Sequence, residues 1–341
     1  MIEGHGDDAY HYTDIRSNFS SNVYSSVDHS GLKQYLVQHL DDLRTYPEPE
    51  PRSLEALLAR HLSLSADQVC VTNGATEAIY LIAQTYRMQT SAVWMPTFSE
   101  YADACRLHGH RVLSIYGLDR LPAGVRLVWL CNPNNPTGEV RNREQLLTCV
   151  REHPQCLFVI DQSYEAFTRS SLLAASEAVA LPNVLLLHSC TKRYAIPGLR
   201  LGYVTGAAEL LQELRSQRMP WSVNALALAA GTYLLEHPGE ASFDLEALLQ
   251  EKVRLTAALQ EVGGLEVWPS DTHYFLVQLR MGKAAALKDF LVREYGLLIR
   301  DASNFEGLDE RFFRIATQTP DANDRLVAGI RTWMYEGYVD V

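Results

Sequence analysis

Short apolar runs alternate with amphipathic segments through the first two thirds of the chain. The runs are rich in Val, Leu and Ile and apolar on both faces, which is typical of strands buried on both sides of a parallel sheet. Between them, the segment 75–87 places Ile79, Ile82 and Tyr86 on one helical face. We therefore expect an α/β domain with helices on both faces of a mostly parallel, seven-stranded sheet. The expected strands are Val69–Thr72, Ala92–Met95, Arg111–Ile115, Leu127–Cys131, Leu157–Asp161, Val184–Ser189 and Leu201–Val204.

The pattern changes after about Leu226, which predicts a smaller α+β domain. The first 30 or so residues are polar and aperiodic and are expected to form an arm. Alternating prolines make 46–52 an extended segment. The expected organisation is an arm over 1–45, a large domain over 46–225 and a small domain over 226–341. The small domain is expected to contain helices at Leu226–Glu236, Asp244–Glu261, Ala284–Tyr295 and Asp321–Tyr335, and strands at Leu265–Trp268, Tyr274–Gln278, Leu297–Arg300 and Phe312–Ala316.

Composition narrows the class of protein. With 341 residues, 47% of them hydrophobic, the chain can build two domains, and its net charge of -11 argues against nucleic acid or anionic membranes as partners. The six cysteines form no C-x-x-C pair and no zinc spacing, so we expect reduced buried thiols and no metal site. The N-terminus lacks the apolar core of a signal peptide, and no run approaches the ~18 residues of a membrane span. We expect a cytoplasmic protein with a small-molecule partner.

A lysine follows one of the expected strands, in the segment 189–202 that reads SCTKRYAIPGLRLG. In a doubly wound sheet, the carboxyl ends of the strands form the edge where ligands bind. An amine placed there can form an imine with an aldehyde cofactor. A single lysine in such a position is usually a solvated surface residue, so the interpretation of Lys192 depends on the segments at the other strand ends.

Those segments carry further polar groups. CNPNNPTG at 131–138 combines two Asn-Pro steps in a rigid turn that projects amide side chains. Asp161 ends a buried strand, where it either caps the next helix or pairs with a cofactor pyridinium nitrogen. TNGATE at 72–77 is a glycine turn before a helix, whose free N–H groups attract phosphate. Phe98, in PTFSEY, either belongs to the core or stacks on a flat cofactor.

Taken together and in this order, these segments resemble the class I/II aminotransferase family of pyridoxal-phosphate (PLP) enzymes, which have fold type I. The resemblance runs from about Tyr46 to the C-terminus and rests on NGATE, PTF, NPNNPTG, DxxY, SxTK, PGLRxG and a late FRIA. It implies a PLP-dependent enzyme with a fold type I large domain and a smaller C-terminal α+β domain. It also implies a homodimer with shared active sites, in which Tyr46 reaches the cofactor phosphate of the neighbouring subunit.

The resemblance implies roles for individual residues. Lys192 carries the cofactor as a Schiff base and later moves protons, and Asp161 pairs with the pyridine nitrogen. Tyr164 and Asn135 bond the phenolic oxygen of the ring, on which Phe98 stacks. The residues implied to hold the cofactor phosphate are Gly74, Ala75, Thr76, Ser189, Thr191 and Arg200.

The expected substrate site is built from cationic side chains and the arm. The resemblance implies that Arg314, in FRIA, binds the substrate α-carboxylate. A phosphorylated substrate needs a second cation, for which Arg300 and His5 are the candidates. The alternative is that Arg300 is a solvated residue at a strand end and that His5 takes no part. Asn22 lies in an arm segment that is similar to one thought to touch the substrate in the family.

The sequence leaves the reaction open between decarboxylation and transamination, because it does not reveal which substrate bond stands perpendicular to the cofactor ring. We expect an amino acid or amine as the substrate, preferably a phosphorylated one. A PLP-binding transcription regulator is a remote alternative, since the roughly 45 residues before Tyr46 are not basic and lack a helix-turn-helix pattern. Retention of Lys192, Asp161 and Tyr164 argues against a non-catalytic scaffold.

Overall fold

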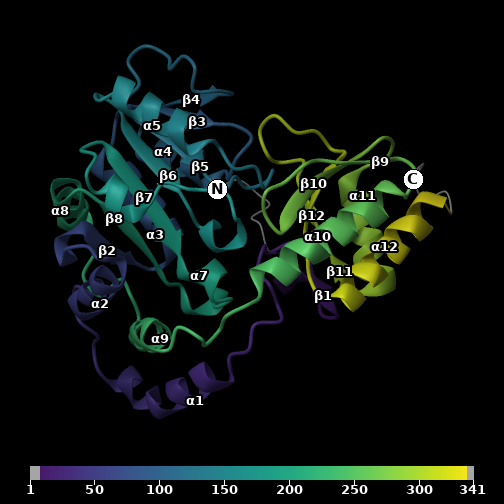
Figure 1. Cartoon of the computed structure of the whole chain (residues 1–341), viewed down its shortest axis with the longest axis horizontal. Coiled ribbons are helices and arrows are strands. Elements are labelled where there is room, and N and C mark those ends of the chain that lie inside the picture. The colour runs from purple at the N-terminus through teal and green to yellow at the C-terminus, as the bar shows by residue number, and fades with distance from the viewer. Residues whose placement is uncertain (1–7, 336–341) are drawn as a thin grey trace.

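A seven-stranded sheet forms the larger of two lobes in the computed structural model, which describes residues 8–335 (Figure 1). The strand order is β2-β8-β7-β6-β5-β3-β4. β8 is antiparallel to both of its neighbours, whereas the other four strand pairs are parallel, so the mostly parallel sheet is confirmed. The strands are β2 (Val69–Thr72), β3 (Thr90–Trp94), β4 (Arg111–Ile115), β5 (Leu127–Cys131), β6 (Leu157–Asp161), β7 (Val184–Ser189) and β8 (Gly202–Gly206).

Both faces of this sheet are buried because successive side chains of each central strand enter different cores. In β6, Val159 packs in one core while Phe158 and Ile160 pack in the core on the opposite face. The first face is covered by α3 (Gly74–Thr85), α4 (Glu100–Leu107) and α8 (Ala208–Gln217). The other face is covered by α2 (Arg52–Leu62), α5 (Arg143–Glu152), α6 (Ala175–Ala178) and α9 (Ala225–Glu236).

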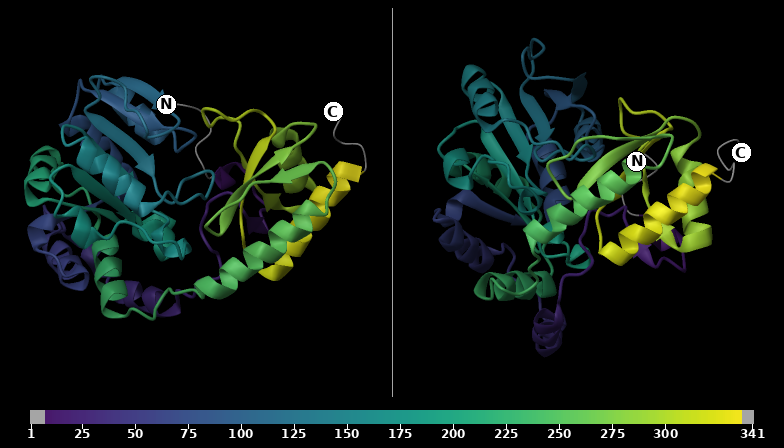
Figure 2. Two further views of the ribbon diagram at one scale, coloured as in Figure 1. Left: turned by 45° about the horizontal axis from the view of Figure 1, so that its top comes forward. Right: turned by 45° about the vertical axis from the view of Figure 1, so that its right-hand side comes forward.

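The smaller lobe is a four-stranded antiparallel sheet in the order β12-β13-β10-β9, packed against three helices. Its separate core is formed by residues such as Phe275, Leu291 and Trp333. Figure 2 shows the two lobes side by side, with α10 running along the smaller one. The elements are β9 (Leu265–Val267), β10 (Tyr274–Leu279), β12 (Arg300–Asp301), β13 (Phe312–Ala316), α10 (Leu245–Gln260), α11 (Ala284–Tyr295) and α12 (Pro320–Tyr335).

The N-terminal segment belongs to both lobes. β1 (Ser17–Asn18) pairs in parallel with β11 (Leu297–Leu298), and the fully buried Phe19 packs in the core of the smaller lobe. The chain then passes to the larger lobe, where α1 (Ser30–Gln38) packs against α9. Residues 19–25 therefore run along the junction of the two lobes.

Two segments differ from the sequence-based expectation. The expected boundary at 226 assigns α9 to the small domain, yet α9 packs against α1 and α2 on the larger lobe. The segment Ala225–Glu236 is apolar at most positions, so its pattern does not reveal which lobe buries it. We propose that the boundary lies between α9 and α10. The expected strand Leu297–Arg300 is divided at Ile299 into β11 and β12, which belong to different sheets.

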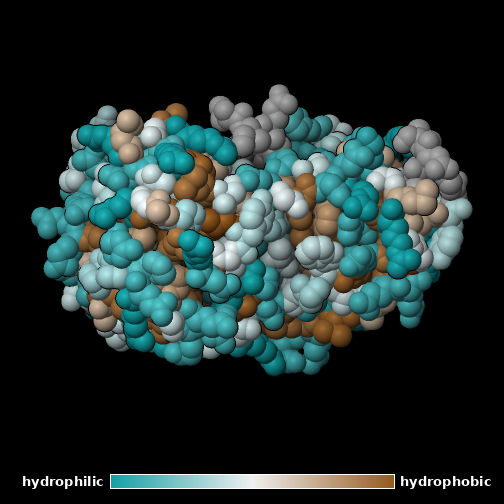
Figure 3. Space-filling view, turned by 90° about the horizontal axis from the view of Figure 1, so that it is seen from above, coloured by the Kyte–Doolittle hydropathy of each residue, from teal (hydrophilic) through white to brown (hydrophobic). Residues whose placement is uncertain are grey.

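One face of the molecule is mainly hydrophilic (Figure 3), and the thiols lie in the interior. On the face seen in Figure 3, hydrophilic side chains predominate and hydrophobic ones lie in small groups. Among residues 8–335, no helix combines the length and the apolar character that a membrane span requires. All six cysteines are buried and free.

Candidate cofactor and substrate site

A cavity of about 220 Å³ lies at the carboxyl ends of β5, β6 and β7, beside the start of α3. This is the edge at which ligands bind in open α/β sheets. The N-terminal segment and β13 of the smaller lobe complete its wall with Ser20, Ser21, Val23 and Arg314. Eleven residues singled out in the sequence line this cavity: Ala75, Thr76, Phe98, Asn135, Asp161, Tyr164, Ser189, Thr191, Lys192, Arg200 and Arg314.

One end of the cavity is suited to a phosphate. Gly74 is the first residue of α3 and has φ +78°. The first N–H groups of α3 point out of the N-terminal end of the helix, where they can bind an anion. A Cβ atom at Gly74 would lie only 2.6 Å from Nη2 of Arg200, so the glycine permits the guanidinium to approach the turn. Nη1 of Arg200 in turn donates to the Thr191 hydroxyl at 3.4 Å. A helix N-terminus, a guanidinium and a hydroxyl therefore converge there.

Lys192 lies in the short helix α7 (Cys190–Arg193), directly after β7. Its Nζ donates to the backbone carbonyl of Ser21 at 2.7 Å and lies 6.0 Å from the centre of the Tyr164 ring. The amine is therefore held at the cavity wall rather than in solvent, which excludes the solvated-lysine alternative.

Asp161 is the last residue of β6 and is buried. Burial raises the pKa of its carboxyl group, while hydrogen bonds from Ser163 and Tyr101 act in the opposite direction. Oδ1 accepts from the Ser163 N–H at 2.8 Å, and Oδ2 accepts from the Tyr101 hydroxyl at 2.7 Å. Each oxygen retains acceptor capacity for a further donor such as a pyridinium N–H. Tyr101, which also lines the cavity, was missed because sequence reasoning singled out only Phe98 in PTFSEY.

Arg314 connects the smaller lobe to the site. It donates from Nη1 to Oδ1 of Asn135 and from Nη2 to the carbonyl of Ser20. The Tyr164 hydroxyl is buried nearby, and burial raises its pKa while the charge of Arg314 opposes that shift. A cation, an amide and a phenol from three separate segments thus surround one part of the cavity.

Arg300 does not line this cavity, but it lies directly opposite Arg314 in the antiparallel pairing of β12 with β13. Opposed residues project from the same face of a sheet, so two guanidinium groups share one face. Arg300 is buried, and burial lowers the pKa of its guanidinium. Its Nη2 donates to Oδ1 of Asn304 at 2.8 Å, which excludes the solvated strand-end alternative.

Asn22 and Tyr46, two further expected residues, are not among those that line the cavity. Asn22 is fully buried between Ser21 and Val23, and its side-chain amide lies close enough to the Tyr164 hydroxyl to oppose the rise in the pKa of that group. Tyr46 is 85% exposed, with its ring centre 5.3 Å from that of Trp221. His5 lies outside the described residues.

His273 is a buried residue near the site that sequence reasoning did not single out. Burial, with the charges of Lys192 and Arg314, lowers its pKa to about 3, so the imidazole is neutral. Its ring stacks on Phe167 with centres 4.0 Å apart, and both ring nitrogens lack a hydrogen-bond partner among the described residues. Thr272 and Tyr274, its neighbours in the chain, give no sequence signal for this environment.

An end suited to a phosphate, a lysine amine and a buried carboxylate lie in one cavity, and these residues fit the cofactor of the class of PLP-dependent enzymes. The family model for aminotransferase class I and II matches residues 16–330. The chain therefore belongs to the class I and II aminotransferase family. The expected fold type I and the expected cofactor, pyridoxal 5'-phosphate, are confirmed.

Known proteins support this membership. Threonine-phosphate decarboxylase from Salmonella typhimurium is 30% identical over 92% of this chain and 90% of its own length. Histidinol-phosphate aminotransferase from Symbiobacterium thermophilum is 32% identical over 86% of this chain and 84% of its own length. The crystal structure of L-threonine-O-3-phosphate decarboxylase from Porphyromonas gingivalis has a TM-score of 0.90 and 37% identity. The match covers 93% of this chain and 99% of that one.

A fourth comparison concerns the fold alone. Histidinol-phosphate aminotransferase from Sinorhizobium meliloti, solved in complex with pyridoxal-5'-phosphate, has a TM-score of 0.82 and 21% identity, covering 95% of this chain and 92% of that one.

The glycine at the phosphate end provides a test of the cofactor site. In Gly74→Ala, a side chain at positive φ costs about 1–2 kcal/mol and its Cβ displaces Arg200. If that cost falls on cofactor binding, the Kd for PLP rises about tenfold, as measured by equilibrium dialysis. Gly198→Ala is the matched control, because a Cβ atom there meets nothing within 4 Å. Equal PLP affinities for the two variants would contradict the assignment of this turn.

Proposed function

We propose that this enzyme decarboxylates a phosphorylated amino acid, with L-threonine O-3-phosphate as the first candidate. The observation that carries the proposal is the pair Arg300 and Arg314 on one face of the small sheet. Like charges directly opposite each other in a sheet repel, and the anionic groups of a substrate would offset that repulsion. A substrate with a carboxylate and a phosphate provides one anion for each guanidinium.

We assign the cofactor roles to residues around the cavity. Lys192 holds the cofactor covalently, Asp161 faces the pyridine nitrogen, and Phe98 covers one side of the ring. Tyr164 and Asn135 bond the phenolic oxygen. The bound cofactor supplies an electron sink for the substrate bond that stands perpendicular to its ring. The phosphate is held by Gly74, Ala75, Thr76, Ser189, Thr191 and Arg200.

The substrate roles follow from the positions of the two arginines. Arg314 takes the carboxylate, because its planar guanidinium suits two parallel hydrogen bonds and already lies at the cavity. Arg300, on the edge strand β12 beside β13, takes the phosphate, with Asn22 and His5 as further contacts from the arm. In this arrangement, Arg314 orients the Cα–carboxylate bond and Lys192 provides the proton donor on the same side of the site.

A second candidate is the transamination of histidinol phosphate. The Symbiobacterium thermophilum relative favours it, since that protein is a histidinol-phosphate aminotransferase. However, histidinol phosphate has one anionic group and no carboxylate, so it offers an anion to only one of the two guanidinium groups. The pair of arginines therefore favours the decarboxylase over this alternative.

We also propose a homodimer. Tyr46 and Trp221 form an exposed aromatic pair, and Met219 is 73% exposed close by in the chain. Exposed apolar groups of this kind are suited to an interface between subunits. Tyr46 would then reach the phosphate of the partner subunit's cofactor. The six free, buried thiols are in keeping with a reducing cytoplasmic location, which we propose as well.

The reaction is tested by a substrate panel on the PLP-loaded enzyme. L-threonine O-3-phosphate should release carbon dioxide, whereas histidinol phosphate, aspartate and aromatic amino acids should yield little keto product. Lys192→Ala should lower turnover by roughly a thousandfold or more, because no amine remains to hold the cofactor or move protons. With a 2-oxo acid present as the amino acceptor, faster formation of a keto product from any of the other amines would overturn the decarboxylase assignment.

Arg300 is tested by its effect on substrate discrimination. Arg300→Ala should cost about 2–5 kcal/mol in kcat/KM for threonine phosphate, because the substrate phosphate loses its charged partner. Unphosphorylated threonine should be affected far less. Arg311→Ala serves as the control, since this exposed arginine on the same lobe forms an ion pair with Asp309. An Arg300 variant with unchanged discrimination would remove this residue from the phosphate site.

The shared site is tested by subunit complementation. Tyr46→Phe and Lys192→Ala homodimers should each be impaired, the former through weaker PLP retention. Mixed dimers contain one site with an intact Lys192 and an intact Tyr46, so part of the activity should return. A fully active monomer in sedimentation, or no recovery on mixing under conditions where subunits exchange, would refute the shared site.

A further inference from the structure

We propose that Glu55 is a positioning residue that acts across the subunit interface. Its buried carboxylate fixes the two surface segments, 46–50 and 218–222, from which Tyr46 and Trp221 project. Glu55 thereby sets the PLP affinity of the partner's site rather than that of its own. This inference rests on the proposed function, in which Tyr46 reaches the cofactor phosphate of the partner subunit.

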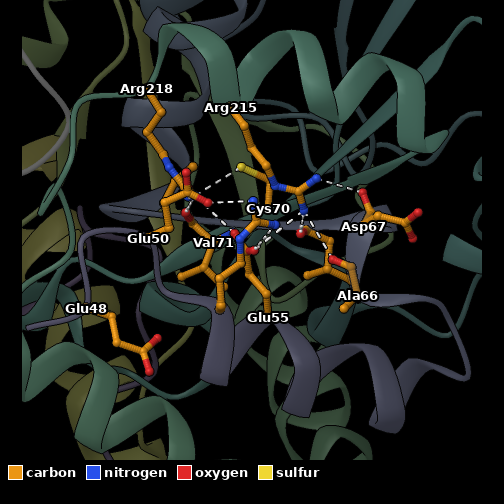
Figure 4. A network of polar contacts seen from close by, with 12 residues as sticks. Glu48, Glu50, Glu55, Ala66, Asp67, Cys70, Val71, Arg215 and Arg218 are labelled. Atoms are coloured by element: carbon orange, nitrogen blue, oxygen red, sulfur yellow. Dashed lines mark hydrogen bonds and ion pairs between the residues drawn. The ribbon is translucent and has the colours of Figure 1, made fainter.

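Glu55 is the centre of the polar network in Figure 4. It lies on α2 with 0% exposure. Its Oε1 accepts from the Val71 N–H at 3.1 Å and from Nη1 of Arg218 at 3.0 Å. Its Oε2 lies 3.2 Å from Nη1 of Arg52 and 3.5 Å from Nη2 of Arg215. One carboxylate therefore joins three arginines and a backbone amide. Arg215 and Arg218 are buried with it, where each partner matters, whereas the side chain of Arg52 is 52% exposed.

Two of these arginines extend the network to the edge of the large sheet. Besides Glu55, Nη1 of Arg218 donates to the carbonyl of Val71 at 2.9 Å, while Nη2 lies 3.9 Å from Glu50. Arg215 donates to three backbone carbonyls just before and within β2, those of Ala66, Asp67 and Val69. The end of α8 is thus attached to the edge strand and to α2.

The network continues to the exposed aromatic pair. Arg218 opens the segment 218–222, and Glu50 closes the segment 46–50. The Trp221 N–H donates to the Pro49 carbonyl at 2.9 Å, which joins the two segments directly. Trp221 has φ +58°, a backbone conformation that a bulky residue keeps only when its surroundings impose it. The Tyr46 ring packs on Trp221, so its position depends on the contacts that Glu55 organises beneath it.

The same network has a competing interpretation within one subunit. β2 leads into Gly74, at the start of α3, so Glu55 would act on its own subunit's phosphate turn if it worked through Val71. The two interpretations predict opposite outcomes in mixed dimers. In such dimers, Glu55→Gln can be placed either on the subunit that contains the working Lys192 or on its partner.

The test uses full-length PLP-loaded mixed dimers, purified with two different tags. In the first, one subunit carries Glu55→Gln and the other Lys192→Ala. The only working Lys192 then receives Tyr46 from a subunit with an intact Glu55. We expect its Kd for PLP to equal that of the wild type, whereas the Glu55→Gln homodimer binds PLP about tenfold more weakly. In the second, a wild-type subunit is paired with one that carries both substitutions, and we expect its working site to show the tenfold loss.

Three results would overturn the proposal: the loss appearing in the first dimer and not in the second, equal losses in both, or no loss in the Glu55→Gln homodimer. Repeating the second dimer with Tyr46→Phe in place of Glu55→Gln tests the proposed function separately. If the Tyr46 dimer shows no loss, the shared site itself is wrong, whatever Glu55 does.

A cofactor-free readout and controls accompany these dimers. In the PLP-free chain, Glu55→Gln should speed exchange of the hydrogen-bonded amides of Arg218 and Trp221 by about tenfold, with the dimer intact in sedimentation. Unchanged exchange at these two amides would overturn the proposal. Glu48→Gln is the matched control, because Glu48 accepts hydrogen bonds from Ser53 rather than from Arg218, which the substitution should leave undisturbed. Should Glu55→Gln fail to fold, Arg218→Lys takes its place in both dimers with the same expectations.

Discussion

The parallel register of β5, β6 and β7 is the constraint on which the site depends. Cys131 pairs with Asp161, and Asp161 pairs with Leu187, so the three strands end at one edge of the sheet. The residues that follow each strand, Asn135, Tyr164 and Lys192, are brought to the same cavity as a result. Residues that are far apart in the sequence thus meet without a specialised loop, because the sheet sets their separation.

The cavity brings several charged side chains together away from water. Backbone carbonyls of the N-terminal segment offset part of the free-energy cost of burying them. Lys192 donates to the carbonyl of Ser21, and Arg314 donates to the carbonyl of Ser20. Phe19, anchored in the core of the smaller lobe, fixes these carbonyls at the junction between lobes. In the proposed function, cofactor and substrate groups take over these two cations, so the segment 19–25 is coupled to the occupancy of the site.

Much of the fold was predictable, because strands buried on both faces have a simple apolar pattern. Val69–Thr72, Leu127–Cys131 and Val184–Ser189 have the expected bounds. The apolar pattern fails where burial alone does not specify the packing partner. The helix α9 is apolar at most positions and packs on the larger lobe instead of the smaller one, and Ile299 separates two strands that belong to different sheets.

The site was predictable in its side chains more than in its surroundings. Lys192, Asp161 and Arg314 stand in recognisable motifs and line the cavity. The carbonyls of Ser20 and Ser21 act through the backbone, which carries no residue-specific signal. His273 was missed for a different reason: its neutral state arises from burial beside Lys192 and Arg314, a tertiary effect.

The central claim, that Lys192 holds the cofactor, is tested most directly by borohydride reduction of the PLP-loaded protein followed by peptide mass spectrometry. Reduction fixes the cofactor to whichever amine carries it. We predict one pyridoxyl group per chain, on Lys192, and none on the other lysines, Lys33, Lys252, Lys283 and Lys288. A label on any of those four at the expense of Lys192, or no stoichiometric label, would contradict it.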